Sequence, residues 1–126
     1  SDGPKIADAI NRLPADAHTA IVGTSLGANE APATVALCKR KVDLIFGIQP
    51  SKYGRRNKIP ANVGRAVCIY NPIDVLTGGL GAYAWFRASG NRTTTLYTYR
   101  YYVGHPGDNI PWIHDILVKH AKEVTK

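Results

Sequence analysis

The stretch Thr19-Ala20-Ile21-Val22-Gly23-Thr24-Ser25-Leu26-Gly27 decides how the rest of the sequence is interpreted. Residues 19–23 form a short apolar run without the alternation of polar and apolar residues that a half-exposed strand shows. Such a run is typical of a strand covered on both faces, as in a parallel sheet. Small and apolar residues from about 26 to 39 predict a helix directly afterwards, in which Pro32 should cause a kink or a break. We therefore predict a strand, a sharp turn and a helix around Ser25.

Strands and helices alternate along the rest of the chain. Apolar runs predict three further strands at residues 42–48, 66–70 and 94–103, and the spacing of apolar residues predicts helices at residues 3–13 and from about 108 to 124. Strands that alternate with helices and long connections imply parallel crossovers. The predicted fold class is therefore α/β, with a three-layer, mostly parallel sheet flanked by helices.

Length and composition indicate one globular domain, residues 1–126. Of the 126 residues, 44% are apolar and 20% are charged, which suits a hydrophobic core and excludes a disordered chain. No apolar run approaches the roughly 20 residues that a membrane-spanning helix needs, so no membrane span is expected. The sequence contains no Met, not even at position 1, and we therefore expect it to be shorter than the native chain. Its start has no signal-peptide pattern, which slightly favours the cytoplasm.

Neither the cysteines nor the positive charge points to a specific partner. Cys38 and Cys68 are too few for a disulfide framework, and we expect both to be buried as small apolar groups. The net charge of +7 favours anionic neighbours such as nucleic acid or phospholipid, but a solvated basic surface explains it more simply. Residues 97–102 interleave tyrosines with an arginine, and we expect their rings to pack against helices rather than on bases. No nucleic-acid partner is therefore expected.

Residues 23–27 form the pattern Gly-x-Ser-x-Gly, which is typical of a sharp and strained turn between a strand and a helix. The serine stands at the tip of such a turn, where small residues on both sides avoid a steric clash. The turn lifts the hydroxyl clear of the sheet and places it at a helix N-terminus, whose N–H groups and dipole can stabilise an oxyanion. The pattern therefore predicts that Ser25 is a nucleophile.

A nucleophilic serine needs an imidazole base and a carboxylate that orients the base. Asp74 lies four residues after the third predicted strand, and His105 lies just after the fourth. All three candidates follow parallel strands, at the edge where sheets of this kind build their sites. His114 is a rival base, although its place beside the apolar stripe of the last helix favours a packing role. His18 precedes the first strand, at the wrong end, and His120 is expected to face solvent.

These residues give the sequence a resemblance to the α/β-hydrolase family of serine esterases and lipases. The resemblance covers nearly the whole chain and rests on three segments: residues 22–28, Asn71-Pro72-Ile73-Asp74, and Gly104-His105 before the last helix. It implies that Ser25 is the nucleophile, Asp74 the acid and His105 the base. It also implies that the backbone N–H of Leu26 is one donor of an oxyanion hole.

The resemblance implies an enzyme that cleaves an ester or related acyl bond of a small-molecule or lipid-like substrate, with no metal or organic cofactor. The loop after the second strand and the Gly-rich segment between acid and base offer three substrate-binding candidates, Tyr53, Leu80 and Tyr83. The family's earlier strands and the loop with the second oxyanion donor have no counterpart here, so we expect the domain to be incomplete at its N-terminus. For this reason a non-catalytic binding or scaffold domain of the same fold is the alternative function. The sequence makes no prediction of the oligomeric state.

Overall fold

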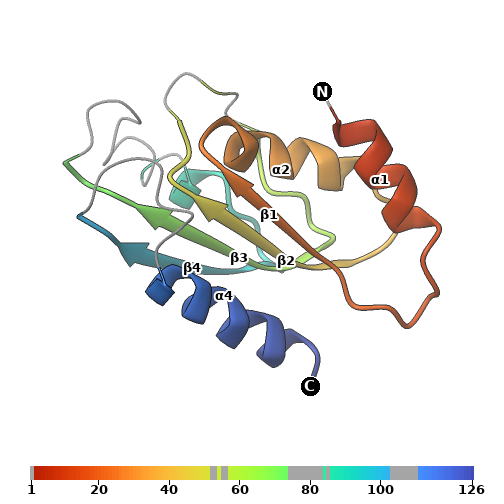
Figure 1. Ribbon diagram of the computed structural model, residues 1–126. Helices are drawn as coiled ribbons and strands as arrows, with labels where there is room; N and C mark the ends of the chain where they lie inside the picture. The colour runs from red at the N-terminus through yellow and green to blue at the C-terminus, as the bar shows by residue number, and fades with distance from the viewer. Residues whose placement is uncertain (1, 52–53, 55–56, 74–83, 85, 103–110) are drawn as a thin grey trace.

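A parallel sheet lies at the centre of the structure, and helices flank it (Figure 1). The structure is a computed structural model that describes residues 2–51, 54, 57–73, 84, 86–102 and 111–126. The elements in chain order are α1 (Gly3–Asn11), β1 (Ala20–Thr24), α2 (Leu26–Ala36), β2 (Val42–Ile48), β3 (Val63–Tyr70), β4 (Thr95–Arg100) and α4 (Pro111–Val124).

The strands are hydrogen-bonded in the order in which they occur along the chain, β1-β2-β3-β4, and all neighbours are parallel. Thr24 at the end of β1 lies opposite Ile48, which lies opposite Ile69, which in turn lies opposite Tyr99. The carboxyl ends of the strands therefore form one edge of the sheet. The α/β architecture with a parallel sheet confirms the predicted fold class at this level.

Helices cover both faces of the sheet. The helices α1 and α2 lie on one face, and α4 lies on the other (Figure 1). Every residue of β2 is buried. The prediction that residues 19–23 form a strand covered on both faces is wrong, because β1 lies at the end of the described sheet and leaves Ala20 and Val22 exposed. Successive side chains of β2 point to opposite faces of the sheet. Ile45 packs in the same core cluster as Val35 of α2, whereas Leu44 packs in the same core cluster as Ile113 of α4. No helix in the described part of the chain is long and apolar enough to cross a membrane.

The predicted break at Pro32 is absent. The helix α2 runs through Pro32 and ends at Ala36, although proline has no N–H to donate to the carbonyl of Ala28. The proline ring is buried and faces the same small cavity as Ile45 and Ile59. The ring therefore lies between α2 and the sheet, in a contact with distant residues that a pattern along the chain cannot show.

Both cysteines are buried and free, as predicted. Burial raises the pKa of the Cys68 thiol to about 12 and also raises the pKa of Cys38. The thiolate is the reactive form of cysteine, and these environments suppress it. Both residues therefore serve the core.

A buried polar cluster around His120 joins α4 to the sheet. The prediction that His120 faces solvent is wrong, because its side chain is fully buried. Its Nδ1 lies 2.9 Å from a guanidinium nitrogen of Arg65 on β3, and its Nε2 lies 2.8 Å from the hydroxyl of Tyr99 on β4. Because Arg65 can only donate, Nδ1 accepts and the proton resides on Nε2, which donates to Tyr99. The histidine is therefore held in its neutral form.

The charges around His120 make this cluster sensitive to pH. Burial lowers the pKa of His120 below 6.5, and the positive charge of Arg65 lowers it further; Lys119 acts in the same direction and Glu123 against it. The ring of Tyr97 packs edge-on against the imidazole at 4.7 Å between centroids. Unfolding restores the usual pKa, so the unfolded chain binds more protons below about pH 6.5. The stability that this cluster supplies is complete above pH 6.5 and is lost as the pH falls through the lower, folded-state pKa.

We expect the free energy of unfolding to decrease from pH 7 to pH 5, and to decrease less in His120→Gln, because a carboxamide can accept and donate without titrating. Urea unfolding at both pH values, followed by Trp fluorescence, measures the difference. His114→Gln changes an exposed histidine of the same helix and should keep the wild-type pH dependence. The same pH dependence in wild type and His120→Gln would contradict the role given to this cluster.

Candidate functional site

Ser25 stands between β1 and α2, in the turn that the Gly-x-Ser-x-Gly pattern indicates. Its backbone has φ 56° and ψ −121°, a conformation that residues with a side chain rarely adopt. The Ser25 N–H donates to the carbonyl of Ile48 at the end of β2 over 2.8 Å, and the Ala28 N–H donates to the Ser25 carbonyl over 3.0 Å. The strained residue is therefore held from both sides, by β2 and by the first turn of α2.

The two glycines of the pattern have different roles. A Cβ at Gly23 would lie 2.4 Å from the carbonyl oxygen of Gly27 and 2.7 Å from the nitrogen of Ala28, so the tight turn requires glycine there. A Cβ at Gly27 would meet no atom within 4 Å outside its own helix and its chain neighbours. The prediction that small residues are needed on both sides of the serine is confirmed at Gly23. At Gly27 the described residues leave open space for a side chain.

The first turn of α2 adjoins Ser25. Leu26 is the first residue of the helix, and the first N–H groups of a helix have no acceptor within it. They lie at the positive end of the helix dipole. An N–H group in this place, next to a serine hydroxyl, is the kind of donor that stabilises a negatively charged oxygen.

The ends of β3 and β4 lie on the same edge of the sheet as Ser25. Asn71 follows β3, and its side-chain oxygen accepts a hydrogen bond from the Ile73 N–H over 3.1 Å, which forms a turn. Arg100 ends β4, and its Nε donates to the hydroxyl of Tyr70 over 3.1 Å. The described chain therefore leaves both strands at the edge that carries Ser25.

Five of the predicted site residues lie outside the described residues: Tyr53, Asp74, Leu80, Tyr83 and His105. Of the predicted site residues, the structure describes only Ser25 and Leu26, which lie side by side at the start of α2. Asp74 follows directly after Ile73, the last described residue of the turn behind β3. The roles of acid, base and substrate-binding residues stay predictions.

The described histidines occupy other parts of the fold. His18 lies at the opposite edge, where its Nδ1 is 3.3 Å from a carboxylate oxygen of Asp43. The same oxygen accepts a hydrogen bond from the Thr19 N–H over 3.0 Å. His18 and Asp43 therefore hold in place the residues that lead into β1. His120 is buried in the contact between α4 and the sheet, and His114 is exposed on α4, which lies on the face opposite α2 (Figure 1).

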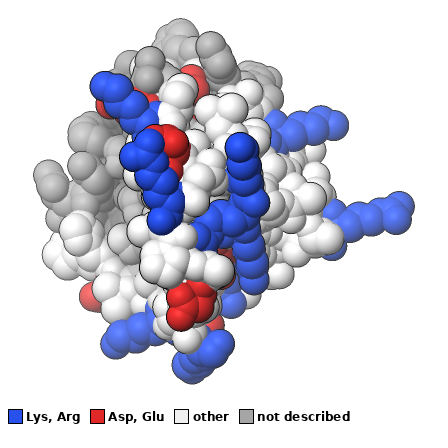
Figure 2. All heavy atoms as spheres, turned by 90° about the vertical axis from the view of Figure 1, so that its right-hand side faces the viewer, with Lys and Arg blue, Asp and Glu red and all other residues white. Residues whose placement is uncertain are grey.

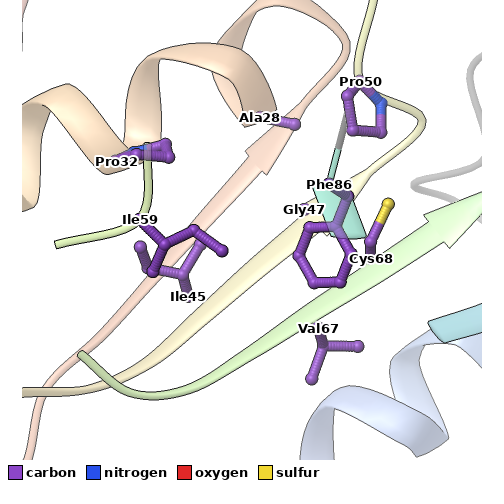
Figure 3. A pocket seen from close by; sticks show the side chains of 9 residues that line it. All are labelled: Ala28, Pro32, Ile45, Gly47, Pro50, Ile59, Val67, Cys68 and Phe86. Atoms are coloured by element: carbon purple, nitrogen blue, oxygen red, sulfur yellow. The ribbon is translucent and has the colours of Figure 1, made fainter. Parts of the chain in front are cut away.

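A small apolar cavity lies beneath α2, close to its N-terminal half (Figure 3). Its volume of about 20 Å³ holds roughly one water-sized group. The lining residues come from α2, β2, β3, the connection after β2 and the helical segment that contains Phe86: Ala28, Pro32, Ile45, Gly47, Pro50, Ile59, Val67, Cys68 and Phe86. Phe86 belongs to the segment between acid and base that the sequence offers as a pocket, whereas sequence reasoning did not single out Pro50, because nothing in its pattern distinguishes a residue that lines a cavity from an ordinary loop residue.

Positive charge covers a different side of the molecule. Figure 2 looks onto the side of the molecule where the strands begin, and Lys and Arg side chains predominate there over Asp and Glu. Arg40 lies in the connection between α2 and β2, and its guanidinium donates to four backbone carbonyls of residues 13–17 over 2.8 to 3.1 Å. This arginine therefore fastens the segment between α1 and β1 and serves the fold.

Within the residues that the structure describes, no group of three or more His, Cys, Asp or Glu side chains is placed to hold a metal ion. Compared with known proteins, the chain matches no family model and no curated sequence. The turn at Ser25 and the order of the strands are therefore the features of the molecule that bear on its function.

We expect Gly23→Ala to lower the free energy of unfolding by about 3 kcal/mol, because the new methyl group overlaps backbone atoms that cannot move cheaply. Gly27→Ala is the matched control, since alanine finds open space there and favours a helix by up to about 1 kcal/mol over glycine. Urea unfolding of both variants measures the two effects. A similar loss in both variants would mean that the turn does not depend on the close approach at Gly23.

Proposed function

We propose that the protein is a serine hydrolase of the α/β-hydrolase type, which cleaves an ester or related acyl bond through a Ser-Asp-His triad. The observation that carries the proposal is the backbone of Ser25, at φ 56° between a strand of the parallel sheet and a helix. Strain of this kind persists only where the surroundings enforce it, and it concentrates at functional sites. A structural turn alone would be satisfied by glycine, which adopts positive φ without strain.

In the proposed reaction, the Ser25 hydroxyl attacks the carbonyl carbon of the substrate while His105 takes its proton. The Leu26 N–H stabilises the negative oxygen of the tetrahedral intermediate. His105 then gives the proton to the leaving alcohol, which leaves an acyl group on Ser25, and Asp74 orients the imidazole throughout. Water, activated by His105, attacks the acyl-enzyme, releases the acid and restores Ser25. These steps balance without an oxidant, a reductant or a metal.

The strand order supports a triad assembled from these residues. Neighbouring strands lie about 4.8 Å apart, so the ends of β3 and β4 are about 10 and 14 Å from the end of β1. Asp74 lies four residues after Tyr70, and His105 lies five residues after Arg100. An extended chain spans about 3.3 Å per residue, which gives a reach of about 13 and 16 Å. The chain is therefore long enough for His105 to approach Ser25, whereas the turn over residues 71–73 keeps the reach of Asp74 below this maximum, and Asp74 needs to reach only the imidazole.

Labelling with a fluorophosphonate probe tests the nucleophile, because the probe reacts with activated serines and spares ordinary ones. We expect the folded protein to react, and Ser25→Ala to lose the reaction. Ser89→Ala is the control, since the Ser89 hydroxyl is buried and donates to the carbonyl of Phe86 over 2.8 Å. Equal labelling of wild type and Ser25→Ala would remove Ser25 as the nucleophile. A folded wild type that neither reacts nor hydrolyses short and long acyl esters would favour the non-catalytic alternative.

Turnover of an activated ester distinguishes the two candidate bases. We expect His105→Ala to lower kcat/KM roughly a thousandfold, because the serine loses its proton acceptor, and His114→Ala to change it less than about threefold. The rates are measured at pH 8, where histidine is neutral and the stability supplied by the His120 cluster is complete. A large loss in His114→Ala with a small loss in His105→Ala would assign the base to His114.

A further inference from the structure

Asn29 lies one helical turn after Ser25 and has no role in the proposed reaction. Its side chain is 1% exposed, although asparagine is usually a surface residue. The Asn29 Nδ2 donates to the carbonyl of Ser51 over 2.9 Å, and its Oδ1 accepts from the Ser51 N–H over 2.7 Å. Both backbone groups of one residue in the connection after β2 are thus paired with a single side chain of α2.

The chain around Ser51 closes over this side chain. A Cβ at Gly54 would lie 2.4 Å from Cγ of Asn29, so the backbone passes directly over the carboxamide. The Gly54 N–H donates to the Ser51 carbonyl over 3.2 Å, and the side chain of Asn57 donates to the Asn29 carbonyl over 3.3 Å. Asn29 is therefore in contact with the connection at three points, Ser51, Gly54 and Asn57.

The start of the same connection is tied to the turn that carries the nucleophile. Ile48 accepts the hydrogen bond of the Ser25 N–H, and the next residue, Gln49, has φ 49° and donates its own N–H to the carbonyl of Ile69 over 2.7 Å. Pro50 follows and lines the apolar cavity beneath α2 together with Ala28 (Figure 3). The residues from Ile48 to Ser51 thus run from the nucleophile turn to the Asn29 contact.

We propose that Asn29 is a positioning residue, which fixes Pro50, Ser51 and Gly54 against the first turn of α2 as one wall of the substrate site. The proposal rests on the hydrolase function proposed above. The chemistry explains the residue type, because a carboxamide can accept from an N–H and donate to a carbonyl at the same time. Aspartate would bring a negative oxygen to the Ser51 carbonyl, and alanine would leave both buried backbone groups without this partner.

The kinetic test compares Asn29→Ala and Asn29→Asp with Asn91→Ala. Asn91 also holds a loop through backbone groups, donating to the carbonyls of Ile59 and Pro60 and accepting from Thr94, but it lies where the strands begin. For hydrolysis of p-nitrophenyl butyrate, we expect the Asn29 variants to raise KM roughly tenfold and to change kcat less than threefold. Asn91→Ala should lower the melting temperature about as much as the Asn29 variants do, but it should keep the wild-type KM.

Amide hydrogen exchange tests the contact without any substrate. The amides of Ser51 and Gly54 should exchange at least about tenfold faster in Asn29→Ala than in Asn91→Ala. Asn29→Asp should recover protection relative to Asn29→Ala as the pH falls from 8 to 5, because burial at this position favours the neutral carboxyl, and a protonated carboxyl both donates and accepts, as the amide does. General destabilisation would produce no such recovery.

Three outcomes separate this proposal from the proposed function. A wild type without Ser25-dependent turnover would overturn both the hydrolase and the positioning role. A wild type that turns over while the Asn29 variants keep the wild-type KM would overturn the positioning role alone. Unchanged exchange at Ser51 and Gly54 in Asn29→Ala would show that the carboxamide does not hold the connection after β2.

Discussion

The backbone of Gly23 closely approaches the backbone of Gly27, and the candidate site is built on this contact. It lets β1 turn into α2 within a single residue, Ser25, and places that residue at positive φ. The turn is held in place by the hydrogen bond from Ser25 to Ile48 at the end of β2. Because the four strands are parallel and follow one another in order, the segments behind β3 and β4 leave the sheet at this same edge.

Residues at the opposite edge of the sheet and on the face under α4 stabilise the fold. Arg40 and the pair of His18 and Asp43 fasten the segment between α1 and β1. The neutral His120 between Arg65 and Tyr99 fastens α4 to β3 and β4. The strain stored at Ser25 is thus opposed by contacts elsewhere in the fold, which is how a protein keeps an unfavourable backbone conformation at one site.

The sequence was sufficient to predict those features of the fold that depend on residues close to one another along the chain. Residues 19–27 predicted the strand, the turn and the helix, and the alternation of strands and helices predicted the parallel sheet. Features that depend on distant partners were missed. Nothing near His120 indicates that Arg65 and Tyr99 will satisfy a buried imidazole, and nothing near Asn29 indicates that the backbone of Ser51 will pair with it. The continuation of α2 through Pro32 depends in the same way on other elements, because the proline ring is buried between this helix and the sheet.

Mass spectrometry of the protein, quenched with acid within the first turnovers of p-nitrophenyl acetate, identifies the residue that attacks the ester. We expect one acetyl group to be covalently bound, on the peptide that contains Ser25. We also expect p-nitrophenol to appear in a burst equivalent to the enzyme concentration, since acylation by an activated ester is faster than the hydrolysis of the acyl-enzyme that follows. Turnover without an acyl group on Ser25, or an acyl group on a different residue, would contradict the assignment of Ser25 as the nucleophile.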